Sequence, residues 1–299
     1  FGYRDTHGMN NSFTRGLDGW VYALHGFSNA SAVKRPGDDA TLLAMKSGNS
    51  YRFKEDGSAI EQLTWGQTNP FGFCFDPWGN AYSADCHSMP AYLLIQGGYY
   101  PGIGKQPSGL GYAPKMIDHN HGSTGIAGIA WYRDDHFPAA YRDTVFIGNP
   151  VNGIVHHDRL QWKGASPMVD SQADFIRCRD PWFRPVDVMM GPDGALYVAD
   201  FYNSIIGHYE VKLDHEKRDR RRGRVWRVVY KGEDGKAPPP TSMPDLTRAP
   251  LPDLVAALSH DNLRVQNLAV NYLANHTATG DPESQAAVAS ACKKVALNA

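Results

Sequence analysis

The stretch Val186-Asp187-Val188-Met189-Met190-Gly191-Pro192-Asp193-Gly194-Ala195-Leu196-Tyr197-Val198 decides the fold of this chain, because related stretches occur at residues 12–22 and 72–82. Each copy has an apolar strand, a turn of Gly and Asp, and a second strand that carries a Tyr. The turn requires a positive φ, which Gly adopts without steric cost. Gly19 and Gly79 are 60 residues apart, and a fourth copy with strands at 126–132 and 144–148 falls where this spacing requires it.

Strand-turn-strand units that recur at this spacing predict an all-β propeller, in which each repeat forms a four-stranded sheet. We expect four blades between residue 1 and about residue 230. The first residue is Phe1 and a blade strand begins close to it, so we also expect a processed or partial chain.

The composition excludes several classes of function. The 299 residues include 30 Gly and 20 Pro, which is typical of a turn-rich β protein. With 30 basic and 31 acidic residues the formal net charge is −1, which favours neither a nucleic acid nor an anionic membrane as the partner. No apolar run approaches the roughly 18 residues of a membrane-spanning helix.

The four cysteines form no C-x-x-C pattern, so the chain encodes neither a zinc knuckle nor a covalent haem site. Cys74 and Cys86 flank one hairpin. They either form a disulfide in an exported protein or are two small buried residues.

The pattern changes after residue 230. Residues 231–250 are a polar, Pro-rich connector, and such linkers are stiff and extended. Residues 251–299 have helical spacing, with an apolar stripe that begins at Leu251 and Leu254. Ser259-His260-Asp261-Asn262 is expected to end the first helix and cap the second, and Asp281-Pro282 to cap a third. The segment is similar to the start of a HEAT-like α-helical solenoid, and the alternative is a small helical cap on the propeller.

The blade sequences resemble those of quinoprotein sugar dehydrogenases, the glucose and sorbosone dehydrogenases. They most resemble exported dehydrogenase-like proteins of planctomycete and verrucomicrobial type, in which a propeller precedes HEAT-like repeats and often a c-type cytochrome domain. The motifs that carry the resemblance are Asp5-Thr6-His7-Gly8, Arg184-Pro185-Val186-Asp187-Val188, Asn203-Ser204-Ile205-Ile206-Gly207-His208 and Gly223-Arg224-Val225-Trp226-Arg227-Val228. The resemblance favours a six-bladed parent with two blades upstream, although a closed four-bladed propeller is also possible.

The resemblance implies a site for pyrroloquinoline quinone (PQQ) and calcium over the central channel. His7 stands where the family has its catalytic base, and an imidazole suits that task because its pKa lies near working pH. Asn69 and Arg184 match cofactor-binding positions, and a guanidinium suits a carboxylate-rich cofactor. Asp85 matches the acidic residue beside the family's calcium. For each residue a purely structural role is the alternative.

Several positions depart from the family pattern. Thr68 and Val186 stand where arginines are expected, Val151 or Asn152 replaces a lysine, and Phe27 lies near the place of an active-site Asp. These departures leave PQQ binding in doubt while they leave the predicted fold intact.

Other candidates are weaker. His119 and His121, with His87 or His156, could form a metal site, and the alternative is solvated histidines in loops. His156-His157 is interpreted as the end of a strand. The basic run at residues 219–224 is interpreted as a solvated loop before a closing strand. Trp65, Tyr99 and Tyr100 are interpreted either as platforms for sugar rings or as core.

Two functional hypotheses follow. The first is an exported, periplasmic or secreted PQQ-dependent sugar or polyol dehydrogenase that passes electrons to an acceptor such as a cytochrome. The second is a non-catalytic scaffold that binds glycans or proteins. A third, an electron-transfer partner with haem c on a segment outside this chain, rests on the architecture of the family alone.

Overall fold

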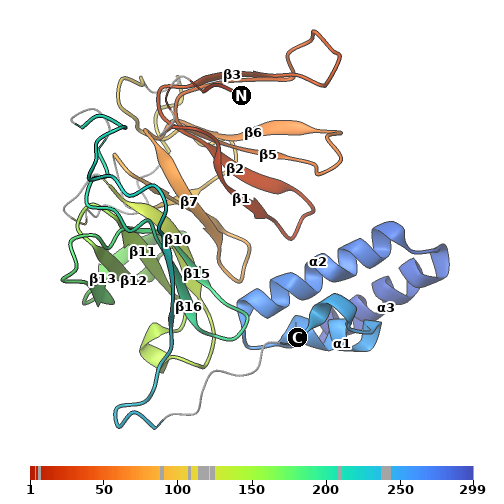
Figure 1. The fold of residues 1–299 in the computed structure, drawn as a ribbon. Helices are drawn as coiled ribbons and strands as arrows, with labels where there is room; N and C mark the ends of the chain where they lie inside the picture. The colour runs from red at the N-terminus through yellow and green to blue at the C-terminus, as the bar shows by residue number, and fades with distance from the viewer. Residues whose placement is uncertain are drawn as a thin grey trace.

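Strands in consecutive antiparallel sheets make up most of the molecule, and helices follow them (Figure 1). The computed structural model describes residues 1–3, 5, 8–87, 91–106, 109–113, 121, 125–207, 211–236 and 244–298. Four sheets succeed one another along the chain, and each begins with one of the strands at which the sequence repeat was recognised.

The first two sheets lie within residues 11–94. The first sheet has the order β1 (Asn11–Arg15), β2 (Val21–His25), β5 (Asn49–Phe53) and β6 (Ile60–Trp65). A separate hairpin between β2 and β5 consists of β3 (Ala30–Val33) and β4 (Leu43–Lys46). The second sheet contains β7 (Pro70–Phe75), β8 (Ala81–Asp85) and β9 (Tyr92–Leu94).

The last two sheets lie within residues 127–228. The third has the order β10 (Ala127–Tyr132), β11 (Thr144–Asn149), β12 (Ile154–Lys163) and β13 (Ser166–Ser171), with β14 (Ile176–Arg177) also paired to β12, and η1 (Ala139–Tyr141) precedes β11. The fourth contains β15 (Pro185–Met190), β16 (Leu196–Asp200) and β17 (Arg224–Val228). The prediction of four strands in every sheet is wrong for the described residues, because the second and fourth sheets have three.

The first strands of the four sheets lie side by side: β7 contacts β1 and β10, and β10 contacts β15. Each of these strands has a register shift near its start, as expected for a β-bulge. The bulges contact one another. Ser12 Oγ accepts a 2.8 Å hydrogen bond from the amide of Gly72, and a Cβ on Gly72 would lie 2.8 Å from the Cα of Gly128. A Cβ on Gly128 would lie 2.4 Å from the Cα of Asp187.

In three of these sheets an Asp in the hairpin turn accepts hydrogen bonds that connect the turn to the neighbouring strands. The hydroxyl of a Tyr on the second strand donates to this carboxylate in the pairs Tyr22–Asp18, Tyr82–Asp76 and Tyr197–Asp193, at 2.7, 3.1 and 3.1 Å. In the first and fourth sheets an Arg on the third strand, Arg52 or Arg227, donates to the same carboxylate. The sequence repeat therefore encodes a repeated Tyr–Asp hydrogen bond as well as a turn.

The C-terminal segment is helical, as predicted. It contains η2 (Leu246–Arg248), α1 (Leu251–Ala256), η3 (Ala257–Ser259), α2 (Leu263–Thr279) and α3 (Pro282–Asn298). Asn262 caps α2 by accepting a hydrogen bond from the amide of Val265, and Asp281 accepts from the amide of Ser284 at the start of α3. No helix among the described residues is long and apolar enough to cross a membrane.

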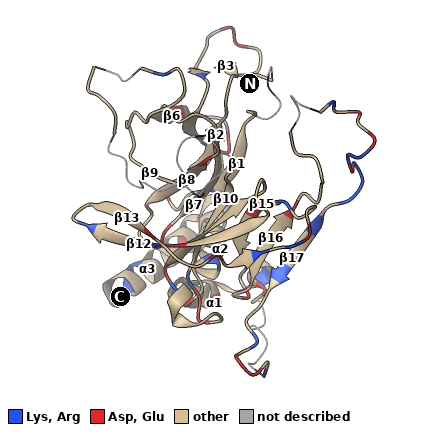
Figure 2. Cartoon of the chain, turned by 90° about the vertical axis from the view of Figure 1, so that its left-hand side faces the viewer, with Lys and Arg blue, Asp and Glu red and all other residues tan. Residues whose placement is uncertain are grey.

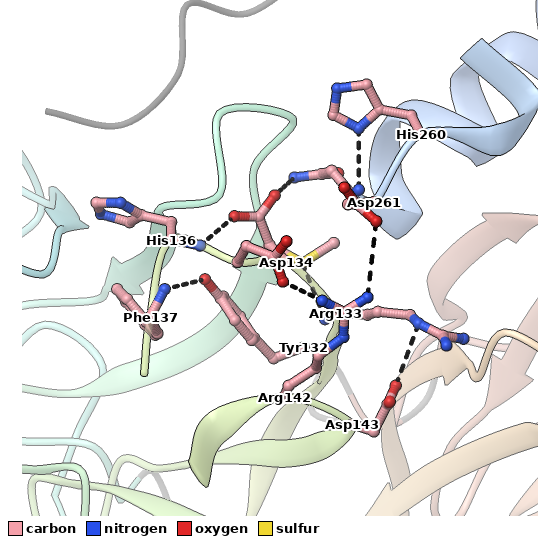
Figure 3. Close-up of polar contacts among 12 residues, drawn as sticks. Tyr132, Arg133, Asp134, His136, Phe137, Arg142, Asp143, His260 and Asp261 are labelled. Carbon is pink, nitrogen blue, oxygen red and sulfur yellow. Dashed lines mark hydrogen bonds and ion pairs between the residues drawn. The ribbon is translucent and has the colours of Figure 1, made fainter. Parts of the chain in front are cut away.

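The N-terminus of α2 is hydrogen-bonded to the third and fourth sheets. Asn262 is buried, and its amide donates to the carboxylate of Asp134 and to the carbonyl of Gly191. Figure 3 shows Arg142 pointing toward Asp261, with which it forms an ion pair at 3.8 Å. These contacts join the helices to the sheets directly, so the connector does not isolate them from the β region.

We predict that Gly128→Ala destabilises the protein by roughly 1–3 kcal/mol, because its methyl group has no space between β10 and β15. Gly109→Ala is the matched control, since a Cβ at Gly109 meets no atom within 4 Å. Urea unfolding followed by Trp fluorescence measures both. Equal stability of the two variants would show that the close approach of the first strands is not a constraint.

Candidate functional site

Asn69 and Asp85, two of the residues predicted from sequence, lie together where β7 begins and β8 ends. The Asp85 carboxylate is 1% exposed and accepts hydrogen bonds from the amides of Thr68, Asn69 and His87, at 2.7, 3.1 and 3.1 Å. Three backbone donors satisfy a buried carboxylate, as a residue that fixes a turn requires. Asp85 therefore has the geometry of the structural alternative.

Both ends of the Asn69 side chain are engaged within the protein. Its Oδ1 accepts from the amide of Phe27 at 2.9 Å, and its Nδ2 donates to the sulfur of Cys86 at 3.1 Å. Asn69 thus connects the first sheet to the second.

Arg184 occupies in the fourth sheet the position that Asn69 has in the second, immediately before the first strand. Its amide donates to Asp200 at the end of β16, as the amide of Asn69 does to Asp85. The guanidinium donates to four backbone carbonyls, those of Pro150, Val151, Asn203 and Ser204. Burial lowers the pKa of Arg184, and the charge of Asp200 partly offsets this. The guanidinium holds loops of two sheets together.

These contacts do not fit the predicted PQQ and calcium. Asn69, Asp85 and Arg184 point their polar atoms at backbone or neighbouring side-chain groups, so they offer little to a carboxylate-rich quinone. Within the described part of the chain no group of three or more metal-binding side chains occurs. His7 and His119 lie outside the described residues.

Two of the described histidines, His121 and His156, are paired with carboxylates. The rings of His121 and His156 stack with centroids 3.7 Å apart. His121 Nε2 lies 2.8 Å from Asp158, and His156 Nδ1 lies 2.7 Å from Asp174. Burial lowers the pKa of His156, and the nearby His121 lowers it further. The interpretation of His156-His157 as a strand end is wrong, since both are buried within β12.

The two cysteines of the second sheet are free thiols, so the disulfide alternative is wrong in this structure. Burial raises the pKa of Cys74 strongly and that of Cys86 to about 12. Thiols with such high pKa values are poor nucleophiles at neutral pH. They serve as small packing residues.

A cavity with a volume of about 1220 Å³ also contains two of the predicted aromatic residues in its wall. It lies between the first sheet, the β3–β4 hairpin and the segment after β9. Trp65 and Tyr99 line it, and they form a parallel bridge, with the amide of Tyr100 donating to the carbonyl of Trp65. Tyr100 is fully buried in the core. Trp65 and Tyr99 therefore have the position expected of a platform for a sugar ring, whereas Tyr100 is a core residue.

Lys105 also lines this cavity, and no pattern in the sequence pointed to it. Its Nζ donates to the carbonyls of Gly48 and Gly66, at 2.5 and 3.3 Å. Burial lowers the pKa of Lys105 to about 8, and the negative charge of Asp85 offsets part of this effect. Only the folding of residue 105 against residues 48 and 66 creates this environment.

The basic run before β17 is exposed, as predicted. Lys and Arg gather on β17 and on the loop before it (Figure 2). Arg222 is paired with Asp219 at 2.5 Å. The run is a solvated surface segment.

Residues 1–232 match a protein-family model described as "Domain of unknown function (DUF7133)", and the chain belongs to this family. No curated protein matches the chain.

Solved structures to which the chain is similar include three sugar dehydrogenases. A glucose dehydrogenase has 21% identity over 77% of this chain and 63% of its own, with a TM-score of 0.48. The apo-form of the aldose sugar dehydrogenase from Escherichia coli has 20% identity over 62% and 58%, with a TM-score of 0.45. The PQQ-bound aldose sugar dehydrogenase from Streptomyces coelicolor has 17% identity over 74% and 62%, with a TM-score of 0.48. The chain thus spans less than two thirds of each.

We predict that the stability of the protein rises with pH above about 8 and that Lys105→Met flattens this rise. The folded-state pKa of Lys105 is about 8, below its ordinary value of 10.5, so the unfolded chain binds more protons between these values. Raising the pH therefore favours the folded state. Urea midpoints between pH 7 and 10 measure the effect. The control is Lys54→Met, because Lys54 also donates to two backbone carbonyls, those of Asp18 and Gly19, but lies outside the cavity. The same slope in wild type and Lys105→Met would contradict the assignment.

Proposed function

We propose that this chain is a carbohydrate-binding β-propeller, with the four sheets as blades, and that it acts as a binding scaffold. The observation that carries the proposal is the cavity of about 1220 Å³ with Trp65 and Tyr99 in its wall. This volume exceeds that of most small-molecule pockets, and it suits an extended ligand such as an oligosaccharide.

The aromatic side chains of the cavity favour a sugar. Trp65 lies on the edge strand β6 and is 41% exposed, and Tyr99 is half-buried beside it. The ring of Tyr112 lies 6.0 Å from that of Tyr99, which extends the aromatic surface. An amphipathic aromatic ring offers an apolar face for the C–H face of a pyranose and leaves its edge in water.

Amide groups provide the polar part of the same cavity. The Gln62 amide donates to the Oδ1 of Asn49, and both residues line the cavity. The side-chain oxygen of Gln62 remains available to accept a hydrogen bond, and Ser47 and the exposed Lys46 lie in the same wall. Hydroxyl groups of a neutral sugar match the uncharged donors and acceptors of Asn49, Gln62 and Ser47.

We predict that Trp65→Ala weakens glycan binding about tenfold, because a well-placed aromatic contact contributes about 1.5 kcal/mol. A glycan array selects the ligand, and calorimetry measures its Kd. Trp162→Ala is the matched control: Trp162 is 44% exposed, close to the exposure of Trp65, but lies on β12 outside the cavity. Equal affinity in the two variants, or an array without binding, would contradict the proposal.

The second candidate is the exported PQQ-dependent sugar or polyol dehydrogenase, with electrons passed to a cytochrome or to haem c on another segment. It is favoured by the position of Asn69 and Asp85 beside the cavity. Lys105 in the cavity wall donates to the carbonyl of Gly66. The hydroxyl of Thr68 accepts from Ile103 in the same wall, and the amide of Thr68 donates to Asp85. In this candidate His7 would act as the base. The contacts of Asn69, Asp85 and Arg184 place it second. A full-length protein without a c-type haem spectrum would remove the haem.

The same proposal covers the organisation of the chain. Residues 1–230 are the propeller portion, with two blades upstream in the six-bladed parent, residues 231–250 the linker, and residues 251–299 the start of HEAT-like repeats. The helices would then add a docking surface to the scaffold. A longer protein without further helical pairs after residue 299 would contradict the solenoid.

We predict that titration with PQQ and calcium leaves Trp fluorescence unchanged up to high micromolar cofactor, because the matched residues are engaged within the protein. Saturable, calcium-dependent quenching would overturn this and place the dehydrogenase first. His7→Ala would then be tested for loss of cofactor-dependent sugar oxidation with an artificial electron acceptor, and unchanged turnover would remove His7 as the base.

A further inference from the structure

A second cavity, of about 280 Å³, lies between the first strands of the four sheets and helix α2. Residues from β1, β7, β10 and β15 line it on one side, and Leu263, Arg264, Asn267 and Asn271 of α2 line it on the other. On β7 the lining residues Phe73, Cys74 and Phe75 belong to the second half of the strand, toward the hairpin turn. The cavity is therefore distinct from the one lined by Trp65 and from the contacts of Asn69, which precedes β7.

Helix α2 directs a polar stripe into this cavity. Arg264, Asn267 and Asn271 follow one another at spacings of three and four residues, so they share one face of the helix. The opposite side of α2 supplies Val265, Ala269 and Leu273 to the core between the helices. Within the described residues the side chains of Arg264, Asn267 and Asn271 make no hydrogen bond and no ion pair. The next turn differs: Asn275 accepts a hydrogen bond from Arg15 on β1 at 3.0 Å, which anchors the helix there.

The position of Arg264 is unfavourable for the protein alone. The side chain is half-buried, and burial lowers its pKa with no acidic neighbour to offset the effect. Arg264 is also the second residue of α2, where the helix dipole disfavours a cation. A desolvated guanidinium that lacks an anion destabilises the fold, and a bound anion would remove that cost.

An acidic side chain lines the other wall. Asp187 lies at the bulge of β15 and lines the cavity, and among the described residues its carboxylate accepts a hydrogen bond only from the adjacent amide of Val188. Asp187 and Arg264 form no ion pair with each other, so an acceptor and a donor both remain available to a ligand.

We propose that this cavity binds a small hydroxy-carboxylate such as a sugar acid, held by Arg264, Asn267 and Asn271 of α2 and by Asp187 of β15. The planar fork of the guanidinium matches a carboxylate in a bidentate geometry. The two amides supply donors and acceptors for hydroxyl groups, and the Asp187 carboxylate accepts from a further hydroxyl. The volume lies at the lower end of the range for ligand pockets, which limits the ligand to about the size of a single sugar acid. The site is independent of the glycan cavity and of any oxidation.

Calorimetric titration of the full chain with D-gluconate tests the site. We expect saturable binding of gluconate and no heat with neutral D-glucose, and we expect Arg264→Gln to weaken binding at least tenfold. Arg248→Gln is the matched control, because Arg248 is exposed on η2 and should leave the affinity unchanged. No binding of gluconate, or a loss of affinity equal in the control, overturns the proposal. Tighter binding of inorganic phosphate than of gluconate also overturns it.

Thermal unfolding separates a ligand site from a structural role. Arg264→Met removes a desolvated charge, so it should raise the Tm of the ligand-free protein while it abolishes the upward shift that gluconate gives to wild type. A lower Tm in Arg264→Met, without a gluconate-induced shift in wild type, would assign Arg264 to structure and overturn the site. Should that variant not fold, Asn271→Ala provides the second measurement: it should lower gluconate affinity and leave the Tm of the ligand-free protein close to that of wild type.

Discussion

The close contact between the bulges of successive first strands is the constraint on which the β region depends. Each bulge contacts the next: Ser12 contacts Gly72, Gly72 contacts Gly128, and Gly128 contacts Asp187. The four residues belong to four different sheets. Two of these positions require glycine because a Cβ would collide with the backbone of the next strand. Bulges also bend and twist their strands. The same four positions thus set how closely the sheets approach and place Asp187 beside the cavity under α2.

The residues that resembled a cofactor site are used to connect the sheets. Asp85 and Asp200 end equivalent strands, and each accepts a hydrogen bond from the amide of the residue that precedes its own first strand, Asn69 or Arg184. A sequence match cannot separate this use from catalysis, because both need a polar residue at the same end of the strand. The departures at Phe27 and Val151 are consistent with the structural use, since their backbone groups bond to Asn69 and Arg184.

Helix α2 changes what the sheets can bind. Its buried cap, Asn262, fixes one end on Asp134 and Gly191, and Asn275 fixes a later turn on β1. Between these anchors the helix faces the first strands with Leu263 and then with three polar residues, Arg264, Asn267 and Asn271. A helix that served only to cover the sheets would bury its apolar stripe against them. Here the apolar stripe packs on α1 and α3, and the polar stripe closes a cavity.

The sequence by itself determined the local elements: the hairpins at Asp18, Asp76 and Asp193, the helix starts at Asn262 and Asp281, and an exposed basic run. Turn chemistry, capping and periodicity act over a few residues, so they can be recognised without a fold. The tertiary structure decided the rest. Lys105 has a lowered pKa, Arg264 lacks an anion, and Trp65 lines a cavity while Tyr100 is buried, because residues distant in sequence surround them. Desolvation depends on those neighbours, and no local pattern records it.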